Sequence, residues 1–483
     1  MQACDAMALS RAMVESLARQ LHAQVIETHI SWVILCADTA YKIKKPVHLP
    51  FVNYSTPEAR RHFCEEEVRL NRRLAPSIYL GVARITGTYS APSIDGPGPV
   101  LEHAVRMRRF PQEALFSERL ATGALAANEV DDLAILLADF HEHAAPVTGD
   151  FGTAQQRSAA ALAAMDGARP AAGTLDIAPL ADWLRAQAQA LTPLWAARAS
   201  SGRIRQCHGD LHLDNIISQD GAVAAFDCIE FDPLLRCIDV LDDIAFAVMD
   251  FAARGRRDFA FRLLNAWLDR TGDHAALPAL RFSSAYRALV RAQVAHLRNA
   301  ADPTPTRRYL QAALSWMQMG PAHLYITHGL PGSGKTHVSQ RLLEHEGAIR
   351  LRSDVERKRL FGLRMLDDSA AQGLNLYTAQ VTAQTYSHLF ATAAPALSAG
   401  LPVVLDAAFL QRGERDQARA LAAQLGVGFS IVHCAAPLAV LRERLLARKG
   451  DASEANALVL EKLHASAQGL YEDERELIDT HWP

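Results

Sequence analysis

The chain has 483 residues, more than one hydrophobic core ordinarily serves, so its length predicts two or three domains. Its composition, 49% hydrophobic and 21% charged, is typical of a globular protein, and a net charge of -3 argues against general nucleic-acid binding. No apolar run is long enough to cross a membrane, and residues 1–21 lack the basic head and apolar stretch of a signal peptide. We therefore expect a cytoplasmic protein without a membrane partner.

Cysteine usage agrees with that expectation. The 7 cysteines are scattered, and none forms a CxxC pair. An odd, dispersed set favours neither a disulfide framework nor a zinc site. We expect small buried thiols in a reducing compartment.

The elements change pattern along the chain. Residues 20–50 are rich in β-branched and aromatic residues and predict short strands, whereas 56–75 and 115–200 have helical spacing. Short strands return over 204–231, and helices continue from there to residue 318. Beyond Gly320-Pro321, apolar strands alternate with helical stretches, which predicts a parallel sheet. We place a domain boundary near 319, between domains 1–318 and 319–483.

The stretch HGDLHLDN carries the spacing of a kinase catalytic loop. Asp210 and Asn215 are separated as in H-R-D-x-x-x-x-N, and Asp227 follows after a short apolar run. In such a loop one carboxylate orients and deprotonates a hydroxyl, while an amide and a second carboxylate hold Mg²⁺. Each residue alone is a common turn former, but the three offsets together predict phosphoryl transfer.

A lysine and a glutamate upstream fit the same chemistry. Phe63, Glu67 and Leu70 share one helical stripe, so Glu67 faces an apolar core, where a carboxylate needs a partner. Lys42, in a predicted strand, is the natural partner, because kinases use this pair to grip the α- and β-phosphates of ATP. Lys44 lies on the same strand face and competes for the role.

Residues 30–250 resemble the aminoglycoside-phosphotransferase and choline-kinase-like family. His212, two residues after Asp210, favours this group over protein kinases, which carry lysine there. The resemblance implies an α+β, protein-kinase-like domain with Asp210 as base, Asn215 and Asp227 as magnesium ligands, and Lys42 with Glu67 on ATP. No glycine-rich loop precedes Lys42, and the resemblance offers Ser31 in the hairpin ETHISW instead. The carboxylates of CIDVLDDIAF, at positions 239, 242 and 243, are interpreted as structural groups that bond the catalytic-loop backbone.

The second domain opens with a complete P-loop motif. GLPGSGKT, residues 329–336, matches GxxxxGK[ST] between a predicted strand and a predicted helix. The backbone N–H groups of such a loop and the helix N-terminus bind phosphate oxygens. Lys335 would reach the β- and γ-phosphates, and the hydroxyl of Thr336 would ligate Mg²⁺. The nucleotide-binding set is Gly329, Gly332, Ser333, Gly334, Lys335 and Thr336.

Further charged residues follow the strands of this domain. Asp406 ends a strand where a second carboxylate helps to hold the metal. Asp354 is either a helix N-cap, in competition with Ser353, or the general base on an acceptor hydroxyl, with Arg357 holding an anionic substrate. The arginines of LRERLLARKG, among them Arg444 and Arg448, form either a solvated basic face or a lid over the transferring phosphate.

Residues 322–470 resemble the small P-loop kinases of the polynucleotide-kinase and zeta-toxin type. The resemblance rests on GLPGSGKT, SDVERKRL, VVLDAAF and LRERLLARKG, and it implies an α/β P-loop NTPase fold. The tandem order resembles bacterial two-domain ATP-binding proteins over nearly the whole chain. It supplies no substrate.

Three functional hypotheses remain. The leading one is a bifunctional phosphotransferase that uses Mg²⁺ and ATP, or GTP, on hydroxyls of small molecules such as sugars, nucleosides or aminoglycosides. The second is a nucleotide-sensing regulatory protein in which one domain is degenerate. The third is a toxin-like kinase restrained by the first domain.

Overall fold

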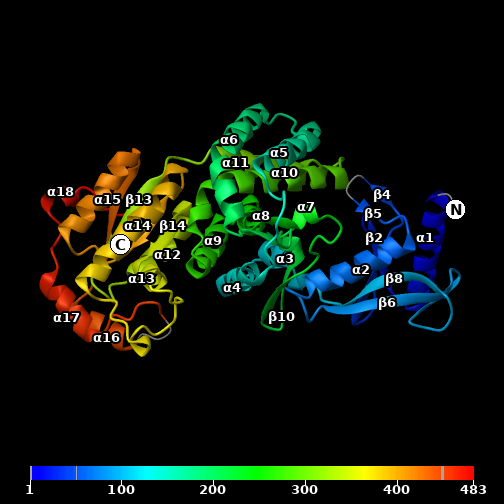
Figure 1. The fold of residues 1–483 in the computed structure, drawn as a ribbon, viewed down its shortest axis with the longest axis horizontal. Helices are drawn as coiled ribbons and strands as arrows, with labels where there is room; N and C mark the ends of the chain where they lie inside the picture. Colours follow the sequence, from blue (N-terminus) through cyan, green and yellow to red (C-terminus); the bar gives the residue numbers. More distant parts are fainter. Residues whose placement is uncertain (1–2, 50–51, 448–450, 483) are drawn as a thin grey trace. The chain divides into compact units, whose positions relative to one another are not determined.

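The computed structural model describes residues 3–49, 52–447 and 451–482, which form two compact units (Figure 1). The first unit comprises Met1–Thr153 and Ala197–Asp243, and the second comprises Ala154–Ala196 and Ile244–Pro483. Two of the three divisions fall within helices, α6 (Ala178–Ser200) and α8 (Val240–Ala253), and the third lies just before residue 154. No helix among the described residues combines the length and hydropathy of a membrane span.

The first unit is built on an antiparallel sheet of six strands in the order β1-β2-β3-β8-β6-β7. These strands are β1 (Gln24–Glu27), β2 (Ser31–Leu35), β3 (Thr39–Lys44), β6 (Tyr79–Thr88), β7 (Ala91–Ile94) and β8 (Val100–Arg108). The shorter strands are β4 (His48–Leu49), β5 (Val52–Asn53), β9 (Ile204–Gln206), β10 (Ile216–Gln219), β11 (Ala222–Ala225) and β12 (Cys237–Asp239). The helices are α1 (Ala3–Gln20), α2 (Pro57–Asn71), α3 (Phe116–Ala121), α4 (Ala127–His143) and α7 (Pro233–Arg236).

The two faces of this sheet pack against different helices. Trp32, Ile34 and Ile43 point to one face and join Met13 and Leu17 of α1 in one apolar cluster. Helix α2 contacts strands β6 and β8, and Figure 1 shows it running along them. Because side chains alternate along a strand, the residues of β3 between the α1-facing positions point to the other face. The polar groups of the site lie there.

The second unit joins a helical group to a parallel sheet. The helices are α5 (Ala154–Ala168), α9 (Arg257–Thr271), α10 (Leu280–Arg298), α11 (Thr304–Met317), α12 (Lys335–Leu342), α13 (Ser353–Leu360), α14 (Ala379–Ser398), α15 (Arg412–Leu425), α16 (Leu438–Ala447), α17 (Ala457–Ser466) and α18 (Glu472–Arg475). The sheet has the order β14-β15-β13-β16, with strands β13 (His323–His328), β14 (Ile349–Arg352), β15 (Val403–Asp406) and β16 (Gly428–His433). The four predicted strands and their parallel arrangement are confirmed.

Helix α9 covers the edge of that sheet. The side-chain amide of Asn265 donates to the carbonyl of Ala348 at 2.9 Å and accepts from the backbone N–H of Arg350 at 2.6 Å. Asn265 therefore occupies the hydrogen-bonding position of a further strand beside β14. The guanidinium of Arg350 also pairs with Asp269 at 3.1 Å, and both side chains are buried. The domain boundary near residue 319 remains a prediction. The second compact unit extends across that position, because α9 packs on β14.

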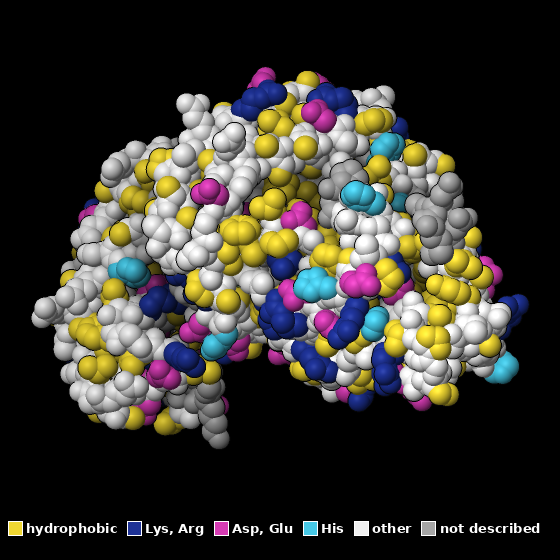
Figure 2. Space-filling model, turned by 45° about the vertical axis from the view of Figure 1, so that its right-hand side comes forward, with side chains coloured by type: hydrophobic (Ala, Val, Ile, Leu, Met, Phe, Trp, Pro, Cys, Tyr) yellow, Lys and Arg dark blue, Asp and Glu magenta, His cyan; other side chains and the backbone are white. Residues whose placement is uncertain are grey.

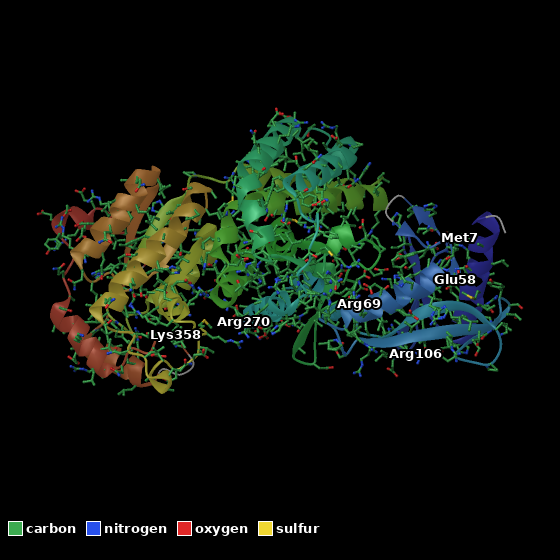
Figure 3. The ribbon with its side chains drawn as sticks, viewed as in Figure 1. Met7, Glu58, Arg69, Arg106, Arg270 and Lys358 are labelled. Atoms are coloured by element: carbon green, nitrogen blue, oxygen red, sulfur yellow. The ribbon has the colours of Figure 1, made fainter. Side chains whose placement is uncertain are left out.

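The surface carries charges of both signs. On the face in Figure 2, arginine and lysine side chains lie beside aspartate and glutamate side chains. Arg69, labelled in Figure 3 on α2, pairs with Glu66 at 2.6 Å, and Arg61 pairs with Glu65 at 2.9 Å on the same helix. Such pairs neutralise one another locally, which agrees with the small net charge.

Candidate active sites

Two lysines meet one glutamate in the first unit. Lys42 Nζ lies 2.9 Å from one carboxylate oxygen of Glu67, and Lys44 Nζ lies 2.7 Å from the other. Both alternatives offered by the strand pattern thus contact the same carboxylate. Burial alone would raise the pKa of Glu67, but the two ammonium groups outweigh it and lower this pKa to about 2. Glu67 is ionised inside the protein because two cations surround it.

Lys42 also reaches the carboxylate predicted to bind magnesium. Its Nζ lies 2.5 Å from Oδ1 of Asp227. The side chain of Lys42 is 14% exposed and that of Asp227 is 45% exposed, so this pair borders solvent. Asp227 has a φ of 63°, in the left-handed region that a non-glycine residue rarely adopts, and its N–H donates to the hydroxyl of Tyr79 at 3.1 Å. The unusual backbone aims its carboxylate at the site.

Residues of the catalytic loop contact one another around Asp210. The amide nitrogen of Asn215 donates to the carbonyl of Asp210 at 2.9 Å and to its carboxylate at 3.3 Å. His212 Nε2 lies 3.3 Å from the same carboxylate. These contacts hold Asp210 and Asn215 together as the spacing predicts. The carboxamide oxygen of Asn215 is a donor of the kind that Mg²⁺ prefers.

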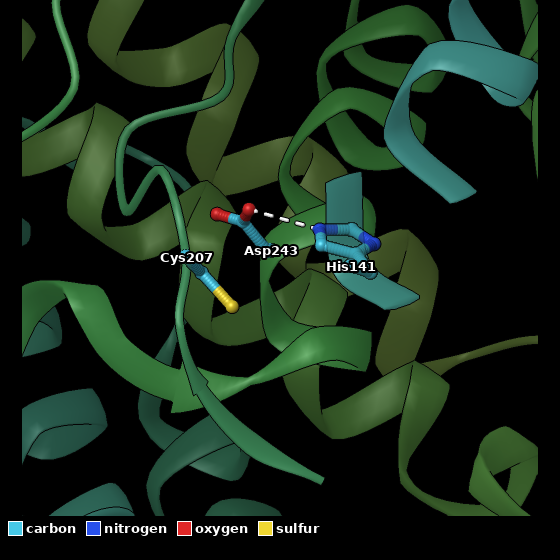
Figure 4. A group of neighbouring side chains, drawn as sticks. All are labelled: His141, Cys207 and Asp243. Carbon is cyan, nitrogen blue, oxygen red and sulfur yellow. Dashed lines mark hydrogen bonds and ion pairs between the residues drawn. The ribbon is translucent and has the colours of Figure 1, made fainter. Parts of the chain in front are cut away.

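A buried cluster of His141, Cys207 and Asp243 contacts the backbone at the start of this loop (Figure 4). Asp243 accepts hydrogen bonds from the N–H groups of His208 at 3.0 Å and Gly209 at 2.8 Å, and its Oδ2 lies 3.1 Å from Nε2 of His141. Burial opposes ionisation of Asp243, but the hydrogen bond and charge of His141 prevail and lower its pKa to about 2. The interpretation of Asp243 as a structural carboxylate that bonds the loop backbone is confirmed.

Cys207 lies beside this pair, and the three side chains are close enough to share a metal ion. Burial raises the pKa of the Cys207 thiol well above its usual range, so the group is not the thiolate that metals bind. The carboxylate of Asp243 is also already engaged by two N–H groups. The cluster therefore fits a brace for the loop better than a metal site.

Ser31 lies at the start of β2, directly opposite Lys44 in the ladder, so the two side chains share a face. The side chain is fully buried, and its hydroxyl has no hydrogen-bond partner in the described part of the chain. Its backbone N–H donates to the hydroxyl of Thr28 at 3.0 Å, which closes the hairpin without a glycine. The role of Ser31 in nucleotide binding stays a prediction.

The P-loop of the second unit has the geometry that its glycines require. Gly329 has a φ of 152°, and a Cβ there would lie 2.2 Å from the carbonyl oxygen of Cys434. Gly332 has a φ of 83°. The ammonium of Lys335 lies across the loop and donates to the carbonyls of Gly329 and Leu330, each at 2.9 Å. Ser333 and Gly334 complete the loop, and α12 begins at Lys335, so a helix N-terminus faces the loop.

A cavity of about 1110 Å³ opens beside this loop. Thr336 and Asp406 both line it, and Ser339 donates from its hydroxyl to Asp406 Oδ2 at 3.0 Å. The hydroxyl and carboxylate oxygens of Thr336 and Asp406 are the hard donors that suit Mg²⁺. The cavity exceeds the 300–1,000 Å³ (roughly) of ordinary ligand sites, which leaves room for a nucleotide and an acceptor together.

Asp354 and Arg357 line the same cavity. The N-cap of α13 is Arg352, without a side-chain cap bond, so neither Asp354 nor Ser353 caps this helix. The carboxylate of Asp354 instead accepts a hydrogen bond from Nη1 of Arg357 at 3.0 Å. Arg357 is buried, and its Nε has no hydrogen-bond partner among the described residues. Its guanidinium can therefore still donate a hydrogen bond to a bound anion. The next residue of α13, Lys358 (Figure 3), forms an ion pair with Glu454, with Nζ and Oε1 2.9 Å apart.

Part of the lining of this cavity was not predicted from the sequence. Tyr377, Tyr386 and Glu414 line it, and the guanidinium of Arg357 lies 4.9 Å from the ring centroid of Tyr377. Burial raises the pKa of Glu414 above its usual value, although a hydrogen bond from Tyr386 opposes this. Spacing along the chain gives no signal for these residues, because the turn before α14, which carries Tyr377, meets α14 and α15 only in the fold.

Arg444 of α16 contacts the P-loop, where its Nη1 donates to the carbonyl of Gly332 at 3.1 Å. Arg444 is otherwise exposed, so its role as part of a lid stays a prediction. Arg448 lies outside the described residues.

Comparison with known proteins matches these two sites to two families. Residues 54–282 match the model of the phosphotransferase enzyme family, and residues 324–470 match that of an AAA domain. Proteins of Mycobacterium tuberculosis and Mycobacterium bovis are each 31% identical over 455 residues, which is 91% of this chain and 89% of theirs.

Two solved structures show partial likeness. A choline/ethanolamine kinase family protein from Mesorhizobium loti is 13% identical, with a TM-score of 0.37, over 64% of this chain and 100% of that one. A gluconokinase from Sinorhizobium meliloti is 21% identical, with a TM-score of 0.25, over 32% of this chain and 79% of that one. From the family models and the full-length relatives, the chain belongs to the family of these mycobacterial proteins and is an ATP-dependent kinase, with a phosphotransferase-family domain followed by a P-loop AAA domain.

Proposed function

We propose that both domains transfer the γ-phosphate of ATP to hydroxyl groups of small molecules, so that the protein is a bifunctional kinase. The observation that carries this proposal is that each unit brings together its own complete set of groups. Each set has a cation for the phosphates, oxygen donors for a metal and a carboxylate suited to an acceptor hydroxyl. We place the reaction in the cytoplasm, where ATP is available.

In the first domain, Asp210 orients the acceptor hydroxyl and takes its proton, while Lys42 exchanges its contact with Asp227 for the α- and β-phosphates. The ion pair with Glu67, 2.9 Å long, fixes the position of the Lys42 ammonium where the phosphates would bind. Asn215 and Asp227 would hold Mg²⁺, which supplies charge neutralisation on the phosphates when bound. The loop contacts of Asp210 preorganise this geometry.

In the second domain, the phosphates lie in the cradle of Gly329–Thr336, with Lys335 on the β- and γ-phosphates. Thr336 and Asp406 would hold the metal. Asp354 accepts the proton of the acceptor hydroxyl, and Arg357, its partner at 3.0 Å, binds oxygen atoms of the acceptor, whether hydroxyl or anionic. Arg444 closes over the transferring phosphate.

The lining of the second cavity supports an acceptor with several hydroxyl groups. Tyrosine hydroxyls, amides and hydroxyl side chains line the cavity together with Asp354, which suits a polyhydroxylated molecule such as a sugar, a nucleoside or an aminoglycoside-like compound. The polar lining residues are Asn375, Tyr377, Thr382, Tyr386, Ser387, Gln411, Glu414 and Gln417.

A metabolite screen tests the proposal. ATP consumption is followed with sugars, nucleosides and aminoglycosides for the wild type, Asp210→Asn and Lys335→Ala, with GTP replacing ATP in a second series. We expect one group of acceptors to lose turnover with Asp210→Asn and another with Lys335→Ala. If no acceptor stimulates ATP consumption, or if one variant abolishes all turnover, bifunctional transfer is wrong.

One observation favours the nucleotide-sensing alternative. The hairpin above Lys42 turns at Thr28–Ser31 without a glycine, so fewer backbone N–H groups can curl around phosphates there. A sensor would bind ATP at each site and hydrolyse it slowly, with no dependence on an acceptor. Acceptor-stimulated turnover in the screen separates the two functions.

A further inference from the structure

The first site contains a second buried lysine that phosphoryl transfer does not require. Lys44 is completely buried, as is Glu67, and Glu230 is 4% exposed. Lys44 forms ion pairs with both carboxylates, and its Nζ lies 4.9 Å from the ring centroid of Tyr54. The hydroxyl of Tyr54 donates to Glu230 at 2.6 Å. An ammonium so fully removed from water persists only where carboxylates compensate it.

The charges of this cluster balance without the solvent-facing aspartate. Lys42 and Lys44 carry two positive charges, and Glu67 and Glu230 carry two negative ones. Asp227 is a third carboxylate, but nearly half of its side chain is exposed, on the side where Lys42 is also accessible. Lys42 is therefore shared between the buried cluster and the open site, whereas Lys44 belongs to the cluster alone.

This difference bears on what happens when a nucleotide binds. To reach the phosphates, Lys42 must give up its contact with Asp227 while its other partner, Glu67, stays ionised. Glu67 remains compensated during that exchange because Lys44 holds its second oxygen at 2.7 Å. Without Lys44, two buried carboxylates would compete for Lys42, and their charge would oppose the incoming phosphates.

We infer that Lys44 is a positioning residue for nucleotide binding in the first domain, a fixed counter-charge for Glu67 and Glu230 that leaves Lys42 available to the phosphates. This inference rests on the proposed nucleotide site of that domain. It predicts that affinity follows the charge balance of the cluster, not the presence of a lysine at position 44.

The test uses the full chain with Lys335→Ala, which removes nucleotide binding by the P-loop. Binding of a non-hydrolysable ATP analogue with Mg²⁺ is measured by calorimetry, and thermal unfolding is measured beside it. In this background Lys44→Met should raise Kd by about tenfold or more, since it leaves one buried carboxylate uncompensated. Adding Glu230→Gln to Lys44→Met restores the balance and should return Kd to within about threefold of the parent.

Two further variants keep the inference testable if Lys44→Met folds poorly. Glu230→Gln alone removes one negative charge and should leave Kd unchanged or lower. Tyr54→Phe is the matched control, because it removes a hydrogen bond to Glu230 at constant charge and should change Kd by less than about twofold.

Each other outcome has a definite meaning. If the Lys335→Ala parent binds no analogue, the proposed nucleotide site is wrong and the role of Lys44 falls with it. If the parent binds and Lys44→Met only lowers the unfolding temperature, the site stands and Lys44 is merely structural. If the double variant folds but stays as weak as Lys44→Met, or Glu230→Gln alone weakens binding about tenfold, the charge argument is overturned.

Discussion

Replacement of Asp243 by asparagine tests how firmly the catalytic loop is held. The carboxylate accepts from the N–H groups of His208 and Gly209 and contacts His141. An asparagine keeps the shape but loses the charge, and turns one acceptor into an NH₂ group that must face a donor. We expect the loop to open more readily while the rest of the first unit keeps its fold.

The magnitude follows from the pKa of Asp243. Its folded value of about 2, against 3.8 for the free group, is a difference of nearly two units in a fully buried residue. At 1.36 kcal/mol per unit this corresponds to roughly 2–3 kcal/mol, or a change of about 60-fold in the opening equilibrium. Because the folded pKa is lowered, this stabilisation is complete above pH 4 (roughly) and is lost as the pH falls toward 2.

Hydrogen exchange read by mass spectrometry is the appropriate assay, because it reports local opening and needs no two-state unfolding. At pH 7 the peptide containing His208 and Gly209 should exchange about 60-fold faster in Asp243→Asn than in the wild type. Asp182→Asn, on the exposed surface of α6, serves as the control. Equal exchange in Asp243→Asn and the wild type at pH 7 would refute the brace, as would a difference that persists undiminished at pH 2 to 3.

Three other predictions concern the second unit. Asp354→Asn should lower acceptor-dependent turnover by about 100-fold or more, as loss of a general base does, without changing the Kd of an ATP analogue measured by calorimetry. Arg444→Ala should weaken that analogue by about threefold to tenfold, because it removes a cation that touches the P-loop; equal affinity would leave the lid without a role. Asn265→Ala should cost about 1–3 kcal/mol in urea unfolding, because Ala348 and Arg350 each lose a hydrogen-bond partner, whereas an unchanged midpoint would contradict the edge contact.

The parts of the fold predicted from sequence are those governed by short-range pattern. Apolar runs between helical stretches predicted β13 to β16, because a parallel sheet is buried on both faces. Strands β6, β7 and β8 were not predicted, since glycine interrupts β6, proline interrupts β7, and several side chains in all three face solvent. The alternation of apolar and polar residues at the end of β8, from Val105 to Arg108, was the signal that could have revealed that strand.

The candidate sites divide in the same way. Fixed spacings located Asp210, Asn215 and the P-loop, but the strand pattern could not choose between Lys42 and Lys44, because both point to one face. The choice depended on α2 and on Glu230, which lies between Ile229 and Phe231. Such apolar neighbours are a signal that a carboxylate is buried and needs a partner. Contacts made between distant segments leave no periodic trace in the sequence.

The contact of Asn265 with β14 has a consequence for how the protein can be divided. A fragment that begins at residue 319 would lack α9, so the N–H and C=O groups along β14 would become an open strand edge. Such an edge pairs readily with the same edge of another copy, which leads to aggregation. The toxicity or harmlessness of the isolated P-loop domain would then report its self-association and not its catalysis. A kinase of this family is better studied whole, with each site silenced by a point substitution.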